Sequence, residues 1–172
     1  MVCDFQIIKK EDFQKIYGEM ESAFIKEERR SFDDAYRVLD NEKYTLYDII
    51  CDGEHIGFIS LWNLKNMMFI EHFAILEECR GKGYGSVVLD SLKNKYKNII
   101  LEAEPPENDI ASRRIAFYER AGFVVNNKPY MQPSYHGAEG VRLVIMSYPS
   151  LIHDFDGVVK ELYSTVYNLE EI

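Results

Sequence analysis

The chain has 172 residues, of which 47% are hydrophobic and 28% are charged, an ordinary composition that suits one globular domain better than two. Its net charge of −9, from 20 Lys and Arg against 29 Asp and Glu, is the opposite of the usual balance in nucleic-acid binders, so we expect no nucleic-acid partner. No stretch approaches the roughly 20 uncharged apolar residues of a membrane span, and we expect no membrane partner.

The cysteines and the first residues bear on the compartment. Cys3, Cys51 and Cys79 are an odd number of cysteines and form no CxxC pair, which favours reduced thiols and argues against a zinc site. Asp4 and Lys9 interrupt the region where a signal peptide has its apolar run. The sequence therefore predicts a cytoplasmic protein that binds no metal.

The first half of the chain alternates between helical and strand patterns. In chain order, these patterns predict a strand over 5–10, helices over 11–24 and 31–41, a hairpin over 44–64 and a strand over 67–76. Ser31 is a good helix N-cap, and Asp52-Gly53 between two β-rich runs is a strong hairpin signal. The last of these strands is apolar on both faces except for Glu71 and His72, which predicts a central place in its sheet.

The second half continues this alternation. We expect helices over 86–96, 110–121 and 150–169, and strands over 98–104, 123–127 and 141–148. Pro105-Pro106 ends the strand before it because proline cannot donate to the ladder, and Gly122 stands where a helix C-cap belongs. The stretch 128–140 contains proline and glycine, and we expect it to be a loop. This order predicts a mixed α/β domain built on one central sheet.

The stretch "CRGKGYGS", residues 79–86, lies between a predicted strand and a predicted helix. A Walker loop is excluded because the spacing G-x-x-x-x-G-K-[ST] is not met. Gly81 and Gly83 fit a dinucleotide fingerprint, but Ser86 takes its third glycine position and the chain before it is an antiparallel meander. The remaining pattern, Arg-x-x-Gly-x-Gly read from Arg80, would turn backbone N–H groups toward an anion at a helix N-terminus.

A second motif, "RRIAFYERAGF" at 113–123, follows about thirty residues after this loop. Together with "HFAILEECRGKGYG" at 72–85, it closely resembles the GCN5-related N-acetyltransferase (GNAT) family, over roughly residues 67–125. The resemblance implies a single-domain α/β fold with a mixed central sheet of about six or seven strands flanked by helices. It also implies an acetyl-CoA-dependent N-acetyltransferase, in which the amine attacks directly in a ternary complex.

The domain implied by the resemblance spans residues 1–172, with a family core over about 2–148. The helix at about 150–169 would be an addition to that core. Its apolar stripe must be buried against its own domain or in a homodimer interface, and the sequence leaves that choice open.

The resemblance implies two segments that bind acetyl-CoA as a co-substrate. Phe73, Ala74 and Ile75 match the strand segment that pairs through its backbone with the pantetheine arm, where one N–H would also face the thioester oxygen. The loop residues match the backbone that holds the pyrophosphate, with Arg80 and Lys82 adding charge. These residues are Arg80, Gly81, Lys82, Gly83, Tyr84, Gly85 and Ser86.

The resemblance also implies catalytic roles. Tyr118 matches the tyrosine that contacts the cofactor near its thiol and protonates the departing thiolate. The family often has an asparagine where this chain has Ala111, and Asn108 is the nearby substitute for that contact with the pantetheine arm. The base that deprotonates the amine is expected to be a carboxylate acting through water, and Glu71 and Glu104 are equal candidates.

The acceptor amine is expected to meet residues on two segments. Glu102 is two residues from Glu104, which predicts that both lie on the same face of a strand. Tyr130 and Tyr135, with His136, lie in the loop before the last strand and could stack against an amine. The alternative is that Pro129 and its neighbours merely stiffen that loop. The acceptor itself could be a small amine or a protein amine.

Two rival functions remain at this stage. A non-catalytic acyl-CoA-binding or sensor module would keep the phosphate loop but would tolerate loss of the tyrosine and of the acids near the thioester. A second rival transfers a longer acyl group, or acylates a hydroxyl. Tyr118, Glu71, Glu102 and Glu104 are all present, which favours the N-acetyltransferase.

Overall fold

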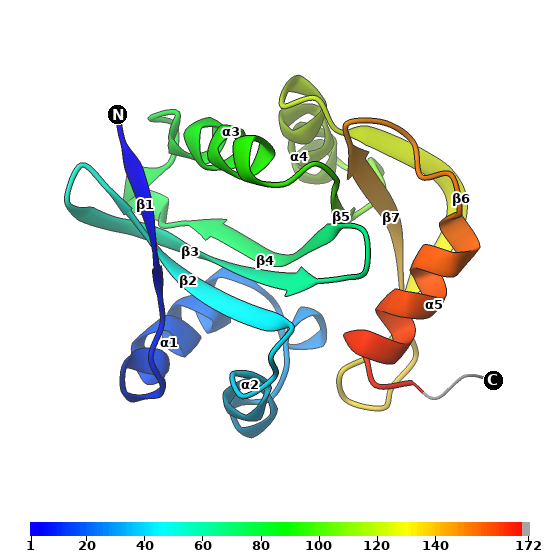
Figure 1. The fold of residues 1–172 in the computed structure, drawn as a ribbon, viewed down its shortest axis with the longest axis horizontal. Coiled ribbons are helices and arrows are strands. Elements are labelled where there is room, and N and C mark those ends of the chain that lie inside the picture. The colour runs from blue at the N-terminus through cyan, green and yellow to red at the C-terminus, as the bar shows by residue number, and fades with distance from the viewer. Residues whose placement is uncertain (170–172) are drawn as a thin grey trace. The chain divides into compact units, whose positions relative to one another are not determined.

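A computed structural model describes residues 1–169 (Figure 1). These residues divide into two compact units. The first unit comprises Met1–Trp62 and Ile70–Lys95, and the second comprises Asn63–Phe69 and the chain from Tyr96 onward. Seven β-strands and five α-helices lie among these described residues, which confirms the expected α/β class and number of strands.

The first unit holds most of four strands together with three α-helices. They are β1 (Cys3–Ile7), α1 (Phe13–Ala23), α2 (Phe32–Val38), β2 (Tyr44–Cys51), β3 (Glu54–Asn63), β4 (Met68–Ile75) and α3 (Tyr84–Lys95). The strands follow the order β1-β2-β3-β4, and β2 is antiparallel to both of its neighbours. In Figure 1, α1 and α2 lie on one side of these strands and α3 lies on the other.

Local signals in the sequence explain two of these boundaries. Asp52 and Gly53 have φ values of 50° and 85°, the left-handed conformation that a two-residue turn between β2 and β3 requires. The Ser31 hydroxyl group accepts a hydrogen bond from the Asp34 N–H at 3.2 Å and caps α2. The predicted hairpin and the predicted cap are both confirmed.

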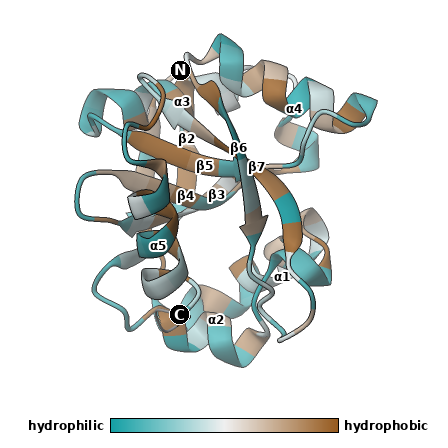
Figure 2. Cartoon of the chain, turned by 90° about the vertical axis from the view of Figure 1, so that its right-hand side faces the viewer, coloured by the Kyte–Doolittle hydropathy of each residue, from teal (hydrophilic) through white to brown (hydrophobic). Residues whose placement is uncertain are grey.

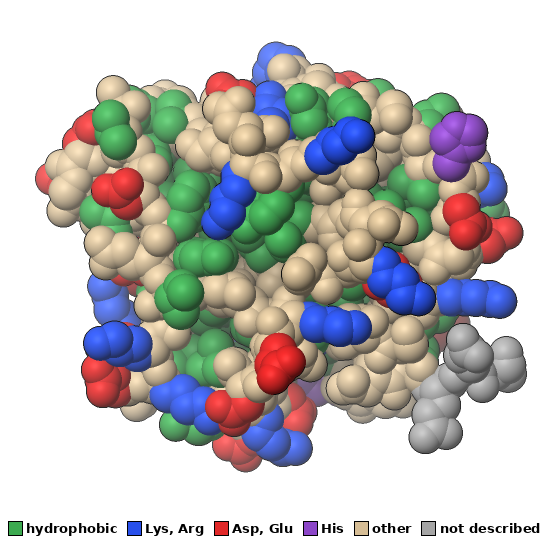
Figure 3. Space-filling view, viewed as in Figure 1, with side chains coloured by type: hydrophobic (Ala, Val, Ile, Leu, Met, Phe, Trp, Pro, Cys, Tyr) green, Lys and Arg blue, Asp and Glu red, His purple; other side chains and the backbone are tan. Residues whose placement is uncertain are grey.

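The core of the first unit joins α1 to the strands. Phe13 and Ile16 of α1 are buried, as are Phe58 and Trp62 of β3. Figure 2 shows β4 largely in the hydrophobic colour, as expected of a strand covered on both faces. The outer surface over α1 and α2 is charged, and Figure 3 shows basic and acidic side chains side by side there.

The first unit corrects the prediction of reduced thiols. Cys3 and Cys51 form a disulfide across β1 and β2, while Cys79 is free and buried. The antiparallel register places Cys3 directly opposite Cys51, with Cα atoms 4.1 Å apart. Sequence spacing could not show this pairing, because it arises only when β1 returns to the edge of β2.

The second unit holds three strands and two α-helices. They are β5 (Ile99–Ala103), α4 (Asp109–Arg120), β6 (Val124–Gln132), β7 (Val141–Tyr148) and α5 (Phe155–Thr165). The strands follow the order β5-β7-β6, and both neighbouring pairs are antiparallel. Gly122 has a φ of 94° after α4, which confirms the expected left-handed C-cap.

Strand β6 is longer than predicted. It continues to Gln132 through a stretch that we expected to be loop, and it contains Pro129. The register of β6 on β7 shifts between Asn126 and Tyr130, so the proline sits where the ladder is already interrupted. An edge strand tolerates such a proline because one side of the strand needs no partner.

Helix α5 is shorter than predicted. Asp154 caps it by accepting from the Gly157 N–H at 3.0 Å, so the helix begins five residues later than expected and ends at Thr165. The helix contacts its own unit: the Tyr163 hydroxyl group donates to the Met131 carbonyl oxygen at 2.6 Å. No helix within residues 1–169 is long and apolar enough to cross a membrane.

Candidate active site

The β4 segment that matches the pantetheine arm approaches β3 closely. A Cβ atom on Gly57 would lie 2.1 Å from the Ala74 carbonyl oxygen, so only glycine allows this approach. The Leu76 N–H donates to the Ile56 carbonyl oxygen at 2.9 Å just beyond. Phe73, Ala74 and Ile75 are each partly exposed, so this segment is not sealed in the core.

The glycine-rich loop is shaped to present backbone. Gly81 and Gly83 have φ values of 74° and 85°, and nothing lies within 4 Å of the Cβ position of either. Alternating left-handed glycines turn successive N–H groups inward, which makes a concave anion-binding surface. Helix α3 begins at Tyr84, two residues earlier than predicted, so Tyr84, Gly85 and Ser86 form its first turn. The positive end of its dipole therefore meets the loop.

Arg80 ties this loop to β4. Its Nε donates to the Ile75 carbonyl oxygen at 3.0 Å, so part of the guanidinium fixes the loop instead of pointing into solvent. Lys82 is exposed between the two glycines. The loop thus combines a fixed backbone with two positive charges, which suits a polyanion such as a pyrophosphate.

Glu71, one of the two expected bases, is engaged on both carboxylate oxygens. Arg30 Nη1 donates to Oε1, and Trp62 Nε1 donates to Oε2 at 3.0 Å, with only 1% of the Glu71 side chain exposed. Burial alone would raise the pKa of Glu71, but the charge of Arg30, aided by His72 and the Trp62 N–H, brings it below its ordinary value. This carboxylate is held ionised by a buried ion pair.

His72 packs against the segment between α1 and α2. Its Nε2 is 2.8 Å from the Glu28 carbonyl oxygen, and its ring meets Phe24 edge to face at 4.8 Å. Burial lowers the pKa of His72 more than the neighbouring Glu71 carboxylate raises it. His72 is therefore a neutral, hydrogen-bonded histidine in the core of the first unit.

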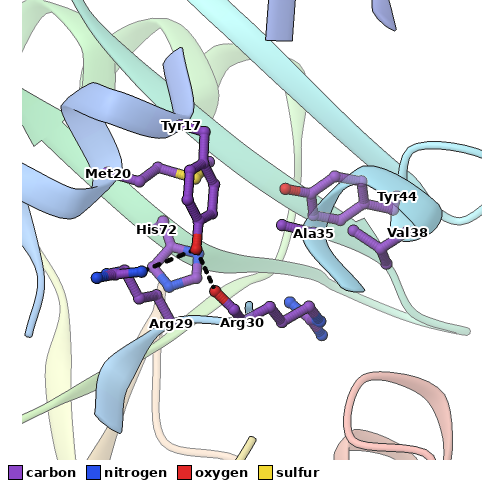
Figure 4. Close-up of a pocket in the computed structure, with 8 residues that line it drawn as sticks. All are labelled: Tyr17, Met20, Arg29, Arg30, Ala35, Val38, Tyr44 and His72. Atoms are coloured by element: carbon purple, nitrogen blue, oxygen red, sulfur yellow. Dashed lines mark hydrogen bonds between the residues drawn. The ribbon is translucent and has the colours of Figure 1, made fainter. Parts of the chain in front are cut away.

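A small cavity lies beside these residues (Figure 4). Its volume is about 10 Å³, which is room for one water molecule at most. The Tyr17 hydroxyl group projects among its lining residues, donating to the Arg30 carbonyl oxygen at 3.0 Å and accepting from Arg29 at 2.8 Å. The cavity is too small for an acceptor molecule.

Tyr118 lies on the buried face of α4 with 9% of its surface exposed. Its ring packs between Phe117 and Phe123, with centroids at 5.2 and 5.8 Å. Burial raises the pKa of Tyr118 to about 12, against a smaller lowering effect of Arg114, so the phenol is protonated at neutral pH. Within residues 1–169 no hydrogen bond of its hydroxyl group is found, which leaves the proton available to a ligand.

Asn108 has a structural role in this chain. Its Oδ1 accepts from the Ala111 N–H at 2.9 Å and caps α4, and the residue is exposed. Its carbonyl oxygen is therefore committed to the helix, although its amide nitrogen is a further donor. The expected contact with the pantetheine arm remains a prediction.

Glu102 and Glu104 contact different elements. Strand β5 ends at Ala103, so Glu104 lies beyond it and meets Arg114 of α4 at 3.5 Å, with 40% of its side chain exposed. Glu102 instead accepts hydrogen bonds from β6 and from Tyr167, which follows α5. The alternation that would put both carboxylates on one face does not extend past the end of the strand.

Around Glu102, the structure gathers residues that the sequence analysis partly missed. Tyr130 lies on β6, not in a loop, and donates its hydroxyl proton to Glu102. Tyr135 packs on the Tyr167 ring at 5.4 Å. Gln132, Tyr163 and Tyr167 were not expected here, although the two tyrosines lie four residues apart within the helix that the sequence predicted over 150–169.

The comparisons with known proteins converge on one family. A family model described as the acetyltransferase (GNAT) family matches residues 10–123. A solved structure of a GNAT protein from Bacteroides thetaiotaomicron is 31% identical, with a TM-score of 0.90 over 97% of this chain and 99% of that one. YjbC of Bacillus subtilis, provisionally named an acetyltransferase, is 33% identical over 74 residues, which are 42% of this chain and 38% of that protein.

More distant structures share the fold alone. A chimera of spermidine N-acetyltransferase SpeG from Vibrio cholerae and hSSAT is 16% identical, with a TM-score of 0.62 over 84% of this chain and 93% of that one. The ribosomal-protein-S18-alanine N-acetyltransferase of Escherichia coli is also 16% identical, with a TM-score of 0.60 over 88% of this chain and 96% of that one.

Proposed function

The chain belongs to the GNAT acetyltransferase family, and from this premise we propose that it transfers the acetyl group of acetyl-CoA to a primary amine. The observation that carries the proposal is the loop at the start of α3. Gly81 and Gly83 are both left-handed there with open space at their Cβ positions, so the backbone is accessible to a ligand. The β4 segment Phe73–Ile75, which follows Glu71, matches the family's other acetyl-CoA-binding segment.

The residues of the first unit fit acetyl-CoA. Backbone N–H groups from Gly81 to Ser86 would hold the pyrophosphate, and Arg80 and Lys82 would balance its charge. The exposed backbone of Phe73–Ile75 would hold the pantetheine arm in the manner of an added strand. One N–H of this segment would donate to the thioester oxygen, where negative charge develops as the amine attacks.

The chemistry is direct acyl transfer. The amine nitrogen forms a bond to the acetyl carbonyl carbon, the carbon–sulfur bond breaks, and the thiolate takes a proton. Tyr118 is the proposed donor of that proton, since its phenol is protonated and its hydroxyl group has no described competing acceptor. The amine must first lose its own proton, and Glu104 acting through water is the better supported base, because its side chain is 40% exposed whereas the Glu71 carboxylate is buried and engaged on both oxygens.

The acceptor is a primary amine on a small molecule or a protein. Two of the distant structures carry names that specify amine acceptors, spermidine and an alanine of a ribosomal protein. At 16% identity these proteins share only the fold, so they do not select the acceptor for this chain. A net charge of −9 favours a cationic acceptor.

A thiol-release assay tests this proposal. The purified protein is incubated with acetyl-CoA and a panel of primary amines, and parallel reactions contain the matching alcohols or propionyl-CoA. We expect amine-dependent release of CoA and an acetylated product by mass spectrometry. Binding of acetyl-CoA without release for any amine would point to a binding module, and release with alcohols alone would point to O-acylation.

A further inference from the structure

Five residues of the second unit gather around the Glu102 carboxylate, and we refer to the six together as the Glu102 cluster. They come from β5, β6, the loop after β6, and the region of α5: Glu102, Tyr130, Gln132, Tyr135, Tyr163 and Tyr167. All lie within one compact unit. Figure 1 shows α5 running beside β6, which brings the tyrosines of the C-terminal region to the strand.

The carboxylate of this cluster is held by neutral donors. Tyr130 donates to Oε1, Gln132 Nε2 donates to Oε2 at 2.8 Å, and the Tyr167 hydroxyl group lies 2.9 and 2.8 Å from the two oxygens. Hydrogen bonds of this kind favour the ionised form. Burial and then the negative charge of Glu102 raise the pKa values of both Tyr130 and Tyr163. The cluster therefore combines an anion with protonated phenols.

The rings of the cluster form two pairs near this anion. Tyr130 and Tyr163 have centroids 6.1 Å apart, and Tyr135 and Tyr167 have centroids 5.4 Å apart. Tyr135, Tyr163 and Tyr167 are partly exposed, so the outer rings are in reach of a solute. Tyrosine faces attract cations, and several such faces around one point are the usual means of binding an alkylammonium group.

Gln132 supplies an independent sign of a missing donor. The residue is 6% exposed, and its Oε1 is a buried acceptor with no hydrogen-bond partner among residues 1–169. Its Nε2 donates to Glu102 and lies 3.1 Å from the Tyr167 hydroxyl group, so flipping the amide would sacrifice these contacts. A buried acceptor without a donor is costly, and the N–H group of an ammonium would satisfy it.

We propose that the Glu102 cluster binds an aliphatic ammonium group of the acceptor, and that this group is not the one acetylated. A nitrogen held by a carboxylate and aromatic faces keeps its proton, and a protonated nitrogen has no lone pair with which to attack a thioester. The acceptor must then carry a second amine, which makes it a diamine or a longer polyamine. This inference rests on the proposed acetyl transfer and adds the class of acceptor.

Direct binding tests the proposal without any need for turnover. The probe is 1,4-diaminobutane, titrated calorimetrically into the full-length protein. The test variant is Glu102→Gln, and the control is Glu107→Gln, which removes the same charge from an exposed pair with Arg142 in the same unit. We expect binding by the wild type and the control, with affinity at least about tenfold weaker for Glu102→Gln. Equal affinities for all three proteins, or no binding by the wild type, would overturn the proposal.

A second variant keeps the proposal testable if Glu102→Gln does not fold. Tyr163→Leu removes a partly exposed ring and leaves the hydrogen bonds of Glu102 in place. We expect it to weaken binding of the diamine while circular dichroism stays that of the wild type. Unchanged affinity would contradict the role of the rings in the proposed site.

Kinetics then separates this proposal from the acetyl transfer itself. With acetyl-CoA, we expect kcat/KM for 1,4-diaminobutane to exceed that for 1-aminobutane at least about tenfold, with 1-aminobutane and tetramethylammonium acting as inhibitors. Glu102→Gln should remove this preference by raising KM for the diamine, with KM for acetyl-CoA unchanged. Equal kcat/KM for both amines would sink the diamine proposal and leave N-acetylation standing. Release of no thiol with either amine would count against the proposed function. The calorimetric data would still show whether the Glu102 cluster binds the diamine.

Discussion

Glu71 and Arg30 form a buried ion pair on the strand that leads to the cofactor segment, with 1% and 11% of their side chains exposed. Glu71 was expected to be a base because a glutamate in an apolar strand is costly to bury and so suggests a function. The structure shows a different reason for it. The carboxylate, Arg30 and Trp62 hold the segment between α1 and α2 against β4, a contact between distant residues that no local pattern displays.

Breaking this pair should destabilise the protein in a pH-dependent way. We expect Arg30→Met to lower the free energy of unfolding at pH 7 by about 3–5 kcal/mol, because it leaves a buried unpaired carboxylate. Since the folded pKa of Glu71 lies below its ordinary value of 4.5, the pair stabilises the fold above that value and loses its effect as the pH falls through the folded pKa.

Urea unfolding at several pH values measures this effect. The difference between wild type and Arg30→Met should be full at pH 7 and should shrink as the pH falls and Glu71 takes up a proton. The double variant with Glu71→Gln should recover most of the loss at neutral pH. A pH-independent difference below about 1 kcal/mol would show that the ion pair contributes little to the free energy of unfolding.

Tyr118 is the residue for which sequence and structure point the same way. We expect Tyr118→Phe to lower kcat roughly 100-fold or more, because the thiolate loses its acid, while KM for acetyl-CoA stays nearly unchanged. Tyr36→Phe is the matched control, since Tyr36 is partly exposed on α2. Steady-state kinetics with saturating amine distinguishes the cases: normal kcat with weakened cofactor binding would contradict an acid role.

At the scale of elements, the sequence predicted most of what local chemistry determines. Caps, hairpins and strand ends follow from single residues such as Ser31, Asp52-Gly53 and Gly122, and all three are confirmed. Strand β6 was predicted too short because Pro129 normally ends a strand, and only the edge position and the register shift explain it. Of the Glu102 cluster, the sequence named Glu102, Tyr130 and Tyr135 as residues that meet the acceptor, but it did not name Gln132, Tyr163 and Tyr167, because these residues are distant from Glu102 along the chain.

Gly57 joins β3 to the cofactor segment and offers a test at this scale. Its Cβ position lies 2.1 Å from the Ala74 carbonyl oxygen, so Gly57→Ala should cost about 1–3 kcal/mol or more and should also weaken acetyl-CoA binding. Gly18→Ala is the control, because Gly18 lies within α1 with nothing within 4 Å of its Cβ position.

Thermal unfolding of Gly57→Ala and Gly18→Ala measures the change in stability that each substitution causes. The free energy of unfolding of Gly18→Ala should rise by about 0.5–1 kcal/mol, because alanine favours the helix and loses less conformational entropy than glycine on folding. Equal stability of Gly57→Ala and the wild type would mean that β3 and β4 separate easily there.

At the scale of the whole molecule, the disulfide is the clearest departure from expectation. Cys3 and Cys51 are 48 residues apart, so their bond closes a long loop around α1 and α2. We expect Cys3→Ser to lower the free energy of unfolding by about 4 kcal/mol under non-reducing conditions. Thiol titration of the denatured, unreduced protein should find one free thiol, that of Cys79, and three free thiols would contradict the bond.

The central claim is that the loop at the start of α3 holds the pyrophosphate of acetyl-CoA. Calorimetric titration of the purified protein with acetyl-CoA, beside NADH and ATP, tests it most directly. The account predicts binding of acetyl-CoA alone, weakened at least about tenfold in a folded Gly83→Val variant, since valine does not adopt the φ of 85° that this position requires. No binding of acetyl-CoA would contradict the account. A preference for NADH would also contradict it and would indicate that the loop binds a dinucleotide.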